Sequence, residues 1–118
     1  MSKINVFLDD VRPAPEEYVL ASDMEECVKL LKEQDIQHLS LDHDLENKIR
    51  NGFMIVEYMV KHQLFAETIT VHSANAGAGK KMFYYLKDAQ ENLLIPQNVK
   101  IHYHPLPLNL INRRKMHP

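Results

Sequence analysis

The sequence contains one cysteine, no long apolar run and no excess of positive charge, and each shortage excludes a class of protein. The single Cys27 excludes an internal disulfide framework and a Cys-x-x-Cys site. No apolar run approaches the roughly 18 residues that a membrane span requires, so we expect no membrane partner. Lys and Arg number 14 against 16 Asp and Glu. This balance argues against a basic nucleic-acid coat, and we expect no duplex-DNA partner.

The rest of the composition is that of an ordinary globular protein. Of 118 residues, 45% are hydrophobic and 25% are charged, which fits one compact domain with a real core. We expect residues 1–118 to form a single domain, with 106–118 as a C-terminal extension whose role the pattern leaves open. The first residues run directly into a strand pattern, so we expect no signal peptide and a cytoplasmic location. No pattern defines an oligomeric state.

Strand-like and helix-like patterns alternate along the chain. Short β-rich apolar runs predict five strands, at 4–8, 18–21, 36–41, 68–71 and 99–103. Apolar residues at helical spacing predict helices near 23–34, 52–63 and 79–94. Ser22 and Glu25 suit a capping box for the first helix, and residues 76–79 suit a small-residue turn before the third. The alternation predicts an α/β fold, a three-layer, five-stranded, mostly parallel sheet with helices on both faces.

The connection between the first two strands is short for a parallel pair. Residues 9–17 contain Pro13 and Pro15, which do not suit the interior of a helix. At about 3.3 Å per residue, nine extended residues reach roughly 30 Å, enough to return along a short strand. We therefore expect an extended crossover without a helix, and an antiparallel second strand is the alternative.

Polar side chains follow four of the five predicted strands. Ligands of open parallel α/β sheets bind outside the carboxyl ends of the strands, so these side chains are expected to line one cleft. Independent strands have no folding reason to place carboxylates and imidazoles at the same end. The residues are Asp9 and Asp10, then Asp42, His43 and Asp44, then His72, Ser73 and Asn75, and finally His102 and His104.

Each of these residues also has a purely structural explanation. The aspartates are common turn formers and caps, Ser73 could cap a helix, and Asn75 could belong to a turn. His38 and His62 are interpreted as ordinary surface or half-buried histidines, and Cys27 as a core residue. Taken together the structural explanations weaken, because they would have to fill one cleft by accident.

Crowded carboxylates repel one another, and this repulsion predicts a bound cation. Asp9, Asp10 and Asp42 would suit Mg²⁺ or Mn²⁺. A nearby imidazole, from His43 or His72, shifts the preference toward Mn²⁺, Fe²⁺ or Zn²⁺. We expect Mg²⁺ or Mn²⁺, with Zn²⁺ as an alternative.

The same cleft carries groups that suit phosphoryl chemistry. An imidazole titrates near neutral pH and can serve as a general acid or base. Arg12, two residues after the acidic pair, could hold a phosphate through a bidentate fork of hydrogen bonds. A metal ion, histidines and an arginine together favour phosphoryl or phosphodiester chemistry.

Three segments resemble a known family. They are Val-Phe-Leu-Asp-Asp-Val-Arg-Pro-Ala-Pro at 6–15, Leu-Ser-Leu-Asp-His-Asp-Leu at 39–45 and Val-His-Ser-Ala-Asn at 71–75. The chain resembles the cyclic-phosphate-processing receiver domains over about residues 4–90, and more broadly the response-regulator receivers. The resemblance implies a flavodoxin-like strand order 2-1-3-4-5. It also implies that Asp9 and Asp10 match the metal-binding acidic pair, Asp42 the phosphoacceptor and Ser73 the hydroxyl residue of strand four.

The sequence departs from the receiver pattern in ways that bear on function. The first receiver helix is replaced by the Arg-Pro-Ala-Pro loop, and the Lys-Pro after strand five is replaced by His104-Pro105. His43, Asp44 and His72 are additional to the receiver site. A domain that only accepts a phosphoryl group needs none of these three, whereas a hydrolase could use all of them.

Two hypotheses about function follow. The first is a metal-dependent phosphoesterase that acts on a cyclic or terminal phosphate of a nucleotide or an RNA end. The second is a non-catalytic signalling module that binds a partner or is phosphorylated on Asp42. For the first hypothesis, the catalytic candidates are His72, His43, Asp42 and Asp44, the substrate-binding candidates are Arg12, Ser73, Asn75 and His104, and the metal ligands are Asp9, Asp10 and Asp42.

Overall fold

The computed structural model describes residues 3–45 and 51–105 of the chain. These residues form five strands and three helices, and the longest helix has 16 residues. None of these helices is long and apolar enough to cross a membrane. The predicted extension at 106–118 lies outside the described residues. The elements are β1 (Ile4–Leu8), β2 (Tyr18–Ala21), α1 (Met24–Glu33), β3 (Ile36–Leu41), α2 (Gly52–His62), β4 (Thr68–Ser73), α3 (Ala76–Glu91) and β5 (Lys100–Pro105).

The five strands form one sheet in the order β2-β1-β3-β4-β5, and every pair is parallel. This arrangement confirms the predicted receiver-like, flavodoxin-like sheet. The connection at 9–17 contains no helix and returns the chain to a strand that runs parallel to β1. The extended crossover is therefore confirmed, and the antiparallel alternative is wrong.

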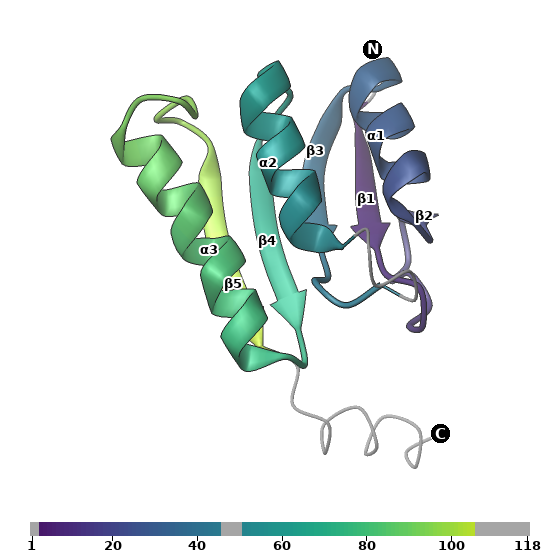
Figure 1. Cartoon of the computed structure of the whole chain (residues 1–118). Helices are drawn as coiled ribbons and strands as arrows, with labels where there is room; N and C mark the ends of the chain where they lie inside the picture. Colours follow the sequence, from purple (N-terminus) through teal and green to yellow (C-terminus); the bar gives the residue numbers. More distant parts are fainter. Residues whose placement is uncertain (1–2, 46–50, 106–118) are drawn as a thin grey trace.

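All three described helices lie on one face of the sheet (Figure 1). The reason is the direction of the crossovers. Connections from β2 to β3, β3 to β4 and β4 to β5 all step the same way across the sheet, and right-handed crossovers that step the same way pass over the same face. Only the step from β1 to β2 runs backwards, and it has no helix. The described residues thus form two layers, and a third layer is not among them.

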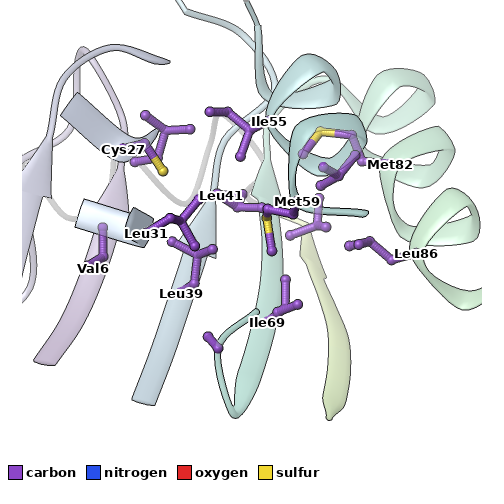
Figure 2. Packing of buried hydrophobic residues seen from close by; sticks show 14 of the residues in the cluster. Val6, Cys27, Leu31, Leu39, Leu41, Ile55, Met59, Ile69, Met82 and Leu86 are labelled. Atoms are coloured by element: carbon purple, nitrogen blue, oxygen red, sulfur yellow. The ribbon is translucent and has the colours of Figure 1, made fainter. Parts of the chain in front are cut away.

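The core fills the space between the sheet and this helical layer. Alternate strand residues such as Val6, Leu39 and Ile69 point toward Met59 and Met82 of the helices (Figure 2). Each of these five side chains is fully buried. Cys27 is also buried in this cluster, as predicted. Burial of a Leu- or Met-sized side chain contributes about 1.5–3 kcal/mol, so the core fixes the strand ends that carry the polar residues.

The first helix is capped one residue later than the sequence predicted. Asp23, not Ser22, is the N-cap, and its carboxylate accepts a hydrogen bond of 2.9 Å from the backbone N–H of Glu26. The Glu26 carboxylate in turn accepts from the backbone N–H of Ser22. The predicted pairing of Ser22 with Glu25 is wrong because Asp23 and Glu26 have the same spacing and Asp caps equally well.

The third helix begins earlier than predicted. Residues 76–79, expected to form a turn, are the first turn of α3, which ends at Glu91. Asn75 caps this turn, because its side chain accepts a hydrogen bond from the backbone N–H of Ala78. Gly79 fits closely against strand residues, since a Cβ there would lie 3.2 Å from Cβ of Ser73 and 3.1 Å from the Tyr103 ring. Small residues therefore allow close packing here rather than ending the helix.

Candidate functional site

Three buried polar residues meet at the carboxyl edge of the sheet. Asp9 follows β1, Asp42 follows β3, and His72 lies near the end of β4. One ligand atom of each lies within 4.8 Å of those of the other two. The arrowheads of β1 and β4 point to this edge in Figure 1. The predicted convergence of Asp9, Asp42 and His72 at one place is confirmed.

Asp9 is the best-bonded carboxylate of the site. Its Oδ1 accepts the backbone N–H groups of Val11 and Arg12 at 2.9 and 2.8 Å, and its Oδ2 accepts from Arg12 Nη1 at 2.7 Å and His72 Nε2 at 3.1 Å. Burial raises the pKa of Asp9. The hydrogen bonds from His72, from the two backbone groups and from the guanidinium outweigh burial and hold this pKa at about 2. Asp9 is therefore ionised at any physiological pH.

The loop that replaces a helix brings Arg12 into the site. The two backbone hydrogen bonds to Asp9 fold the chain back immediately after β1, which returns the Arg12 side chain over the strand ends. Nη1 of Arg12 then lies 2.7 Å from Asp9 Oδ2 and 3.4 Å from Asp42 Oδ2. Arg12 Nε is buried without a hydrogen-bond partner among the described residues. The guanidinium is thus held mainly by the two carboxylates.

Asp42 is less well compensated than Asp9. Its side chain contacts Arg12 Nη1 and, through Oδ1, the backbone N–H of Asp44, both at 3.4 Å. Burial and the negative charge of Asp9 raise the pKa of Asp42 to about 7, and Arg12 offsets only part of this effect. Near neutral pH, binding of a proton or a cation therefore stabilises the Asp42 carboxylate.

His72 is held on three sides. Its Nδ1 lies 2.7 Å from Oγ of Ser40, and its ring stacks on Phe7 with centroids 4.3 Å apart and planes 2° apart. Because the ionised Asp9 carboxylate only accepts hydrogen bonds, the network assigns the ring hydrogen to Nε2, and Nδ1 accepts from the Ser40 hydroxyl. Burial lowers the pKa of His72, although Asp9 raises it in part. Both nitrogens of His72 are thus engaged.

A second polar group lies beside the first. Nδ1 of His43 is 2.6 Å from Oδ1 of Asp44, and Asn75 Nδ2 donates to the same oxygen at 3.4 Å. The Ser73 hydroxyl accepts the backbone N–H of Asn75 at 3.1 Å. Asp44 is exposed and His43 is half-buried, so this group faces solvent. The backbone N–H of Asp44 joins the two groups by its contact with Asp42.

The remaining candidates lie around this centre. Asp10 is half-buried next to Asp9, and Asp9 rather than Asp10 belongs to the tight cluster with Asp42. His104 lies within β5, is exposed, and pairs in register with His72. The strands β4 and β5 extend further than predicted, so both histidines lie inside strands rather than after them.

Ser40 and Phe7 were not singled out from the sequence. The signal that could have found them is strand periodicity. Phe7 lies two residues before Asp9 and Ser40 two before Asp42, so they share a sheet face with the acidic residues. A polar residue in a run that is otherwise apolar, such as Ser40 in Leu-Ser-Leu, marks the face that the core does not use.

The donor set of the buried cluster could hold a divalent cation. Two carboxylates and one imidazole suit Mn²⁺, Fe²⁺ or Zn²⁺, and carboxylates alone suit Mg²⁺. Arg12 Nη1 occupies the space between the carboxylates, so a cation must displace it. The buried Nε of Arg12, which has no partner in the described part of the chain, is consistent with a side chain that can leave this position. The residues therefore fit a metal ion, provided that the Arg12 side chain moves out of the space between the carboxylates.

Comparison with known proteins identifies a family for the chain. A family model described as the cyclic-phosphate processing receiver domain matches residues 4–88. No curated protein matches the chain. The matched region contains β1 to β4, the connection at 9–17 and every member of the buried cluster. The fold, the acidic residues that follow β1 and β3 and the match over most of its length show that the chain belongs to the cyclic-phosphate processing receiver domain family.

Proposed function

We propose that this protein is a phosphoesterase that opens a cyclic phosphate, or removes a terminal phosphate, on a nucleotide or an RNA end. The observation that supports it most is Arg12, whose guanidinium stands between two buried carboxylates at the strand ends. A guanidinium fork matches the oxygens of a phosphate. A displaced Arg12 would remain next to the cluster and could bind the substrate there.

The groups that would hold the phosphate surround the cluster. Arg12 supplies charge, Ser73 a hydroxyl, Asn75 an amide and His104 an imidazole, all at the carboxyl edge of β1, β4 or β5. Donors aimed at the phosphate oxygens stabilise the charge that develops when water adds to phosphorus. We propose that Arg12 contributes most, because it alone is permanently cationic.

Proton transfer is best assigned to His43. Its Nδ1 is bonded to Asp44, which leaves Nε2 available to a water molecule, whereas both nitrogens of His72 are engaged. In hydrolysis of a cyclic phosphate, His43 takes a proton from water, the water oxygen bonds to phosphorus, and one phosphorus–ribose oxygen bond breaks. The leaving oxygen takes a proton from Asp42, whose pKa of about 7 keeps part of it protonated, when no metal ion is bound, and from bulk water when a metal ion occupies Asp42.

A divalent ion, Mg²⁺ or Mn²⁺ first and Zn²⁺ as an alternative, would be held by Asp9, Asp42 and His72, with Asp10 beside them. When bound, it would polarise a phosphoryl oxygen and lower the pKa of a water molecule. His72 could ligate this cation as well as it now donates a hydrogen bond to Asp9. The Ser40 hydroxyl can donate to Nδ1 or accept from it, so His72 can turn its Nε2 lone pair to a cation without losing Ser40.

The test is turnover of nucleoside 2′,3′-cyclic and 3′,5′-cyclic phosphates with Mg²⁺, Mn²⁺ or Zn²⁺, followed by chromatography of the phosphomonoester product. We expect His43→Ala and Arg12→Ala to lose roughly 10²–10⁴-fold in rate. The control is His62→Ala, an exposed residue near the end of α2. Equal losses in His62→Ala and His43→Ala would contradict the assignment.

The signalling alternative predicts a different product. If Asp42 is a phosphoacceptor, acetyl phosphate should modify the protein covalently, and Asp42→Asn should abolish the modification. The structure disfavours this, because Asp42 is only 3% exposed and Arg12 lies on its Oδ2. Covalent phosphate on Asp42 without turnover of any cyclic phosphate would establish the signalling function in place of the enzyme.

A further inference from the structure

The sheet face opposite the helices is lined by rings. Side chains that alternate with the buried core residues face this side, and no described helix covers it. Tyr18 Oη is hydrogen-bonded to His38, and His38 Nε2 lies 2.7 Å from Thr70 Oγ1, so these side chains link β2, β3 and β4 on this side. We call this surface the ring face, defined by Tyr18, His38, His102 and His104, which are half-buried or exposed and lie on the same side of the sheet as the buried rings of Phe7 and His72.

The ring face is continuous with the candidate site. Asp9 lies two residues after Phe7, so the two side chains point to the same side of β1. The buried His72 connects the two, because it stacks on Phe7 and bonds to Asp9. His104 pairs in register with His72 on the neighbouring strand. A phosphate held by Arg12 therefore has the ring face beside it.

Charge on the ring face favours an anionic occupant. The chain contains 16 Asp and Glu. Nevertheless the strand residues on this side include no carboxylate within the described part of the chain. Lys100, His102 and His104 stand on one side of β5, two residues apart, and all three are exposed. This edge presents one ammonium and two imidazoles in a row, the exposed Leu20 and half-buried Tyr18 lie on β2 at the opposite edge, and the half-buried His38 lies on β3 between the two edges.

We infer that the ring face binds the nucleotides of a single-stranded RNA whose terminal phosphate occupies the site. This inference rests on the proposed function and specifies its substrate as a polynucleotide end rather than a free mononucleotide. Unpaired bases stack on aromatic and imidazole rings, and cationic side chains follow the backbone. The accessible rings of Tyr18, His38, His102 and His104 provide the stacking surface, and Lys100 and Arg12 provide the cationic contacts.

The chain offers a matched pair of variants. Lys100→Ala with His102→Ala removes one ammonium and one imidazole from the ring face. Lys61→Ala with His62→Ala removes the same groups from α2, on the other side of the sheet. All four residues are exposed, so neither pair should impair folding. Any difference between the two double variants reports the position of the groups, not their charge.

The binding probe is a fluorescent six-nucleotide single-stranded RNA with a 2′,3′-cyclic phosphate end, compared with the cyclic mononucleotide. We expect the hexamer to bind at least tenfold more tightly than the mononucleotide. The ring-face double variant should weaken hexamer binding at least fivefold and leave turnover of the cyclic mononucleotide within twofold. The α2 double variant should behave as the wild type. Equal hexamer binding by both double variants would overturn the inference.

A chemical footprint separates this inference from the proposed function. Diethyl pyrocarbonate should modify both His102 and His62 in the free protein, and the hexamer should protect His102 alone. Turnover of the mononucleotide without protection of His102 overturns the ring face and leaves the enzyme. Protection without any turnover overturns the enzyme and supports the ring face. If His102 resists the reagent in the free protein, the protein itself covers this face and the inference fails.

Discussion

The hydroxyl of Ser40 lies 2.7 Å from Nδ1 of His72, and both side chains are buried. The pair connects β3 to β4 on the side of the sheet away from the core. Because Nε2 of His72 donates to Asp9, Ser40 completes a chain of three residues in which each donor has an acceptor. Ser40 therefore determines which ring nitrogen of His72 faces the carboxylates.

Ser40→Ala should destabilise the protein and loosen His72. The substitution leaves a buried ring nitrogen without a donor, which costs about 1–3 kcal/mol. Urea unfolding measures the cost, and ¹⁵N spectra of the imidazole should show a shifted Nδ1 resonance, because Nδ1 has lost its donor while Asp9 keeps the hydrogen on Nε2. Ser40→Thr keeps the hydroxyl and should retain the wild-type spectrum. Unchanged stability and an unchanged spectrum in Ser40→Ala would show that the hydrogen bond is unimportant.

Asp42→Asn should stabilise the protein at pH 8 but not at pH 4. The pKa of Asp42 is raised from 3.8 to about 7 in the folded state. Its protonation therefore favours folding below about pH 4, and this contribution is lost as pH rises from 4 to 7. Asn cannot ionise, so the variant should gain on the order of 2–4 kcal/mol at pH 8. Urea unfolding between pH 4 and pH 8 measures the difference.

Asp9→Asn should change the stability of the protein in the opposite direction and serves as the control for Asp42→Asn. The pKa of Asp9 is lowered from 3.8 to about 2, so its ionised form favours folding above about pH 4, and this contribution disappears as pH falls toward 2. The variant should therefore be less stable than wild type at pH 6. If Asp9→Asn and Asp42→Asn changed stability in the same direction at pH 8, the assignment of unequal carboxylates would be wrong.

Gly52→Ala should distort the site without changing any polar side chain. A Cβ at Gly52 would lie 2.0 Å from the carbonyl oxygen of Asp42 and 3.0 Å from Cα of His43, and backbone must move to admit it. We expect a loss of roughly 1–3 kcal/mol in stability and weaker metal binding. Gly77→Ala, also in a helix, has only the Asn75 side chain at 4.0 Å and should gain about 0.5–1 kcal/mol. Thermal unfolding of both variants measures these two changes in stability.

The sequence predicted the location of the site better than its internal order. The convergence of Asp9, Asp42 and His72 follows from parallel strands, whose carboxyl ends meet at one edge whatever their loops do. The sequence does not predict which of the two carboxylates, Asp9 or Asp42, has its negative charge compensated by hydrogen bonds. The backbone bonds to Asp9 and the return of Arg12 depend on the fold of one irregular loop, which carries no periodic signal.

The placement of the helices on the sheet shows the same limit of prediction from the sequence. The alternation of strands and helices predicts helices without saying which face they cover. The face follows only when the strand order is known, because handedness converts the direction of each step into a side of the sheet. The helix starts at Asp23 and Asn75 were misplaced by one to a few residues, since adjacent residues such as Ser22 and Asp23 cap almost equally well.

The last prediction concerns Arg12, because its guanidinium occupies the position that a metal ion would need. Its guanidinium already compensates Asp9 and Asp42, so a divalent cation must compete with a built-in positive charge. Removing that charge leaves two carboxylates facing each other, and at an effective dielectric constant near 20 a unit charge at 4 Å contributes about 4 kcal/mol.

Arg12→Met should therefore bind Mn²⁺ more tightly than the wild type, by roughly tenfold or more, while losing the proposed phosphoesterase turnover. The two effects should have opposite signs because Arg12 would compete with the metal and, in the proposed function, would bind the phosphate of the substrate. Isothermal titration with Mn²⁺ measures the affinity, and circular dichroism confirms that the variant is folded. Lys87→Met, which removes a positive charge from the exposed surface of α3, is the control and should leave the affinity unchanged. Weaker Mn²⁺ binding in Arg12→Met would mean that the arginine organises the carboxylates for the cation instead of competing with it.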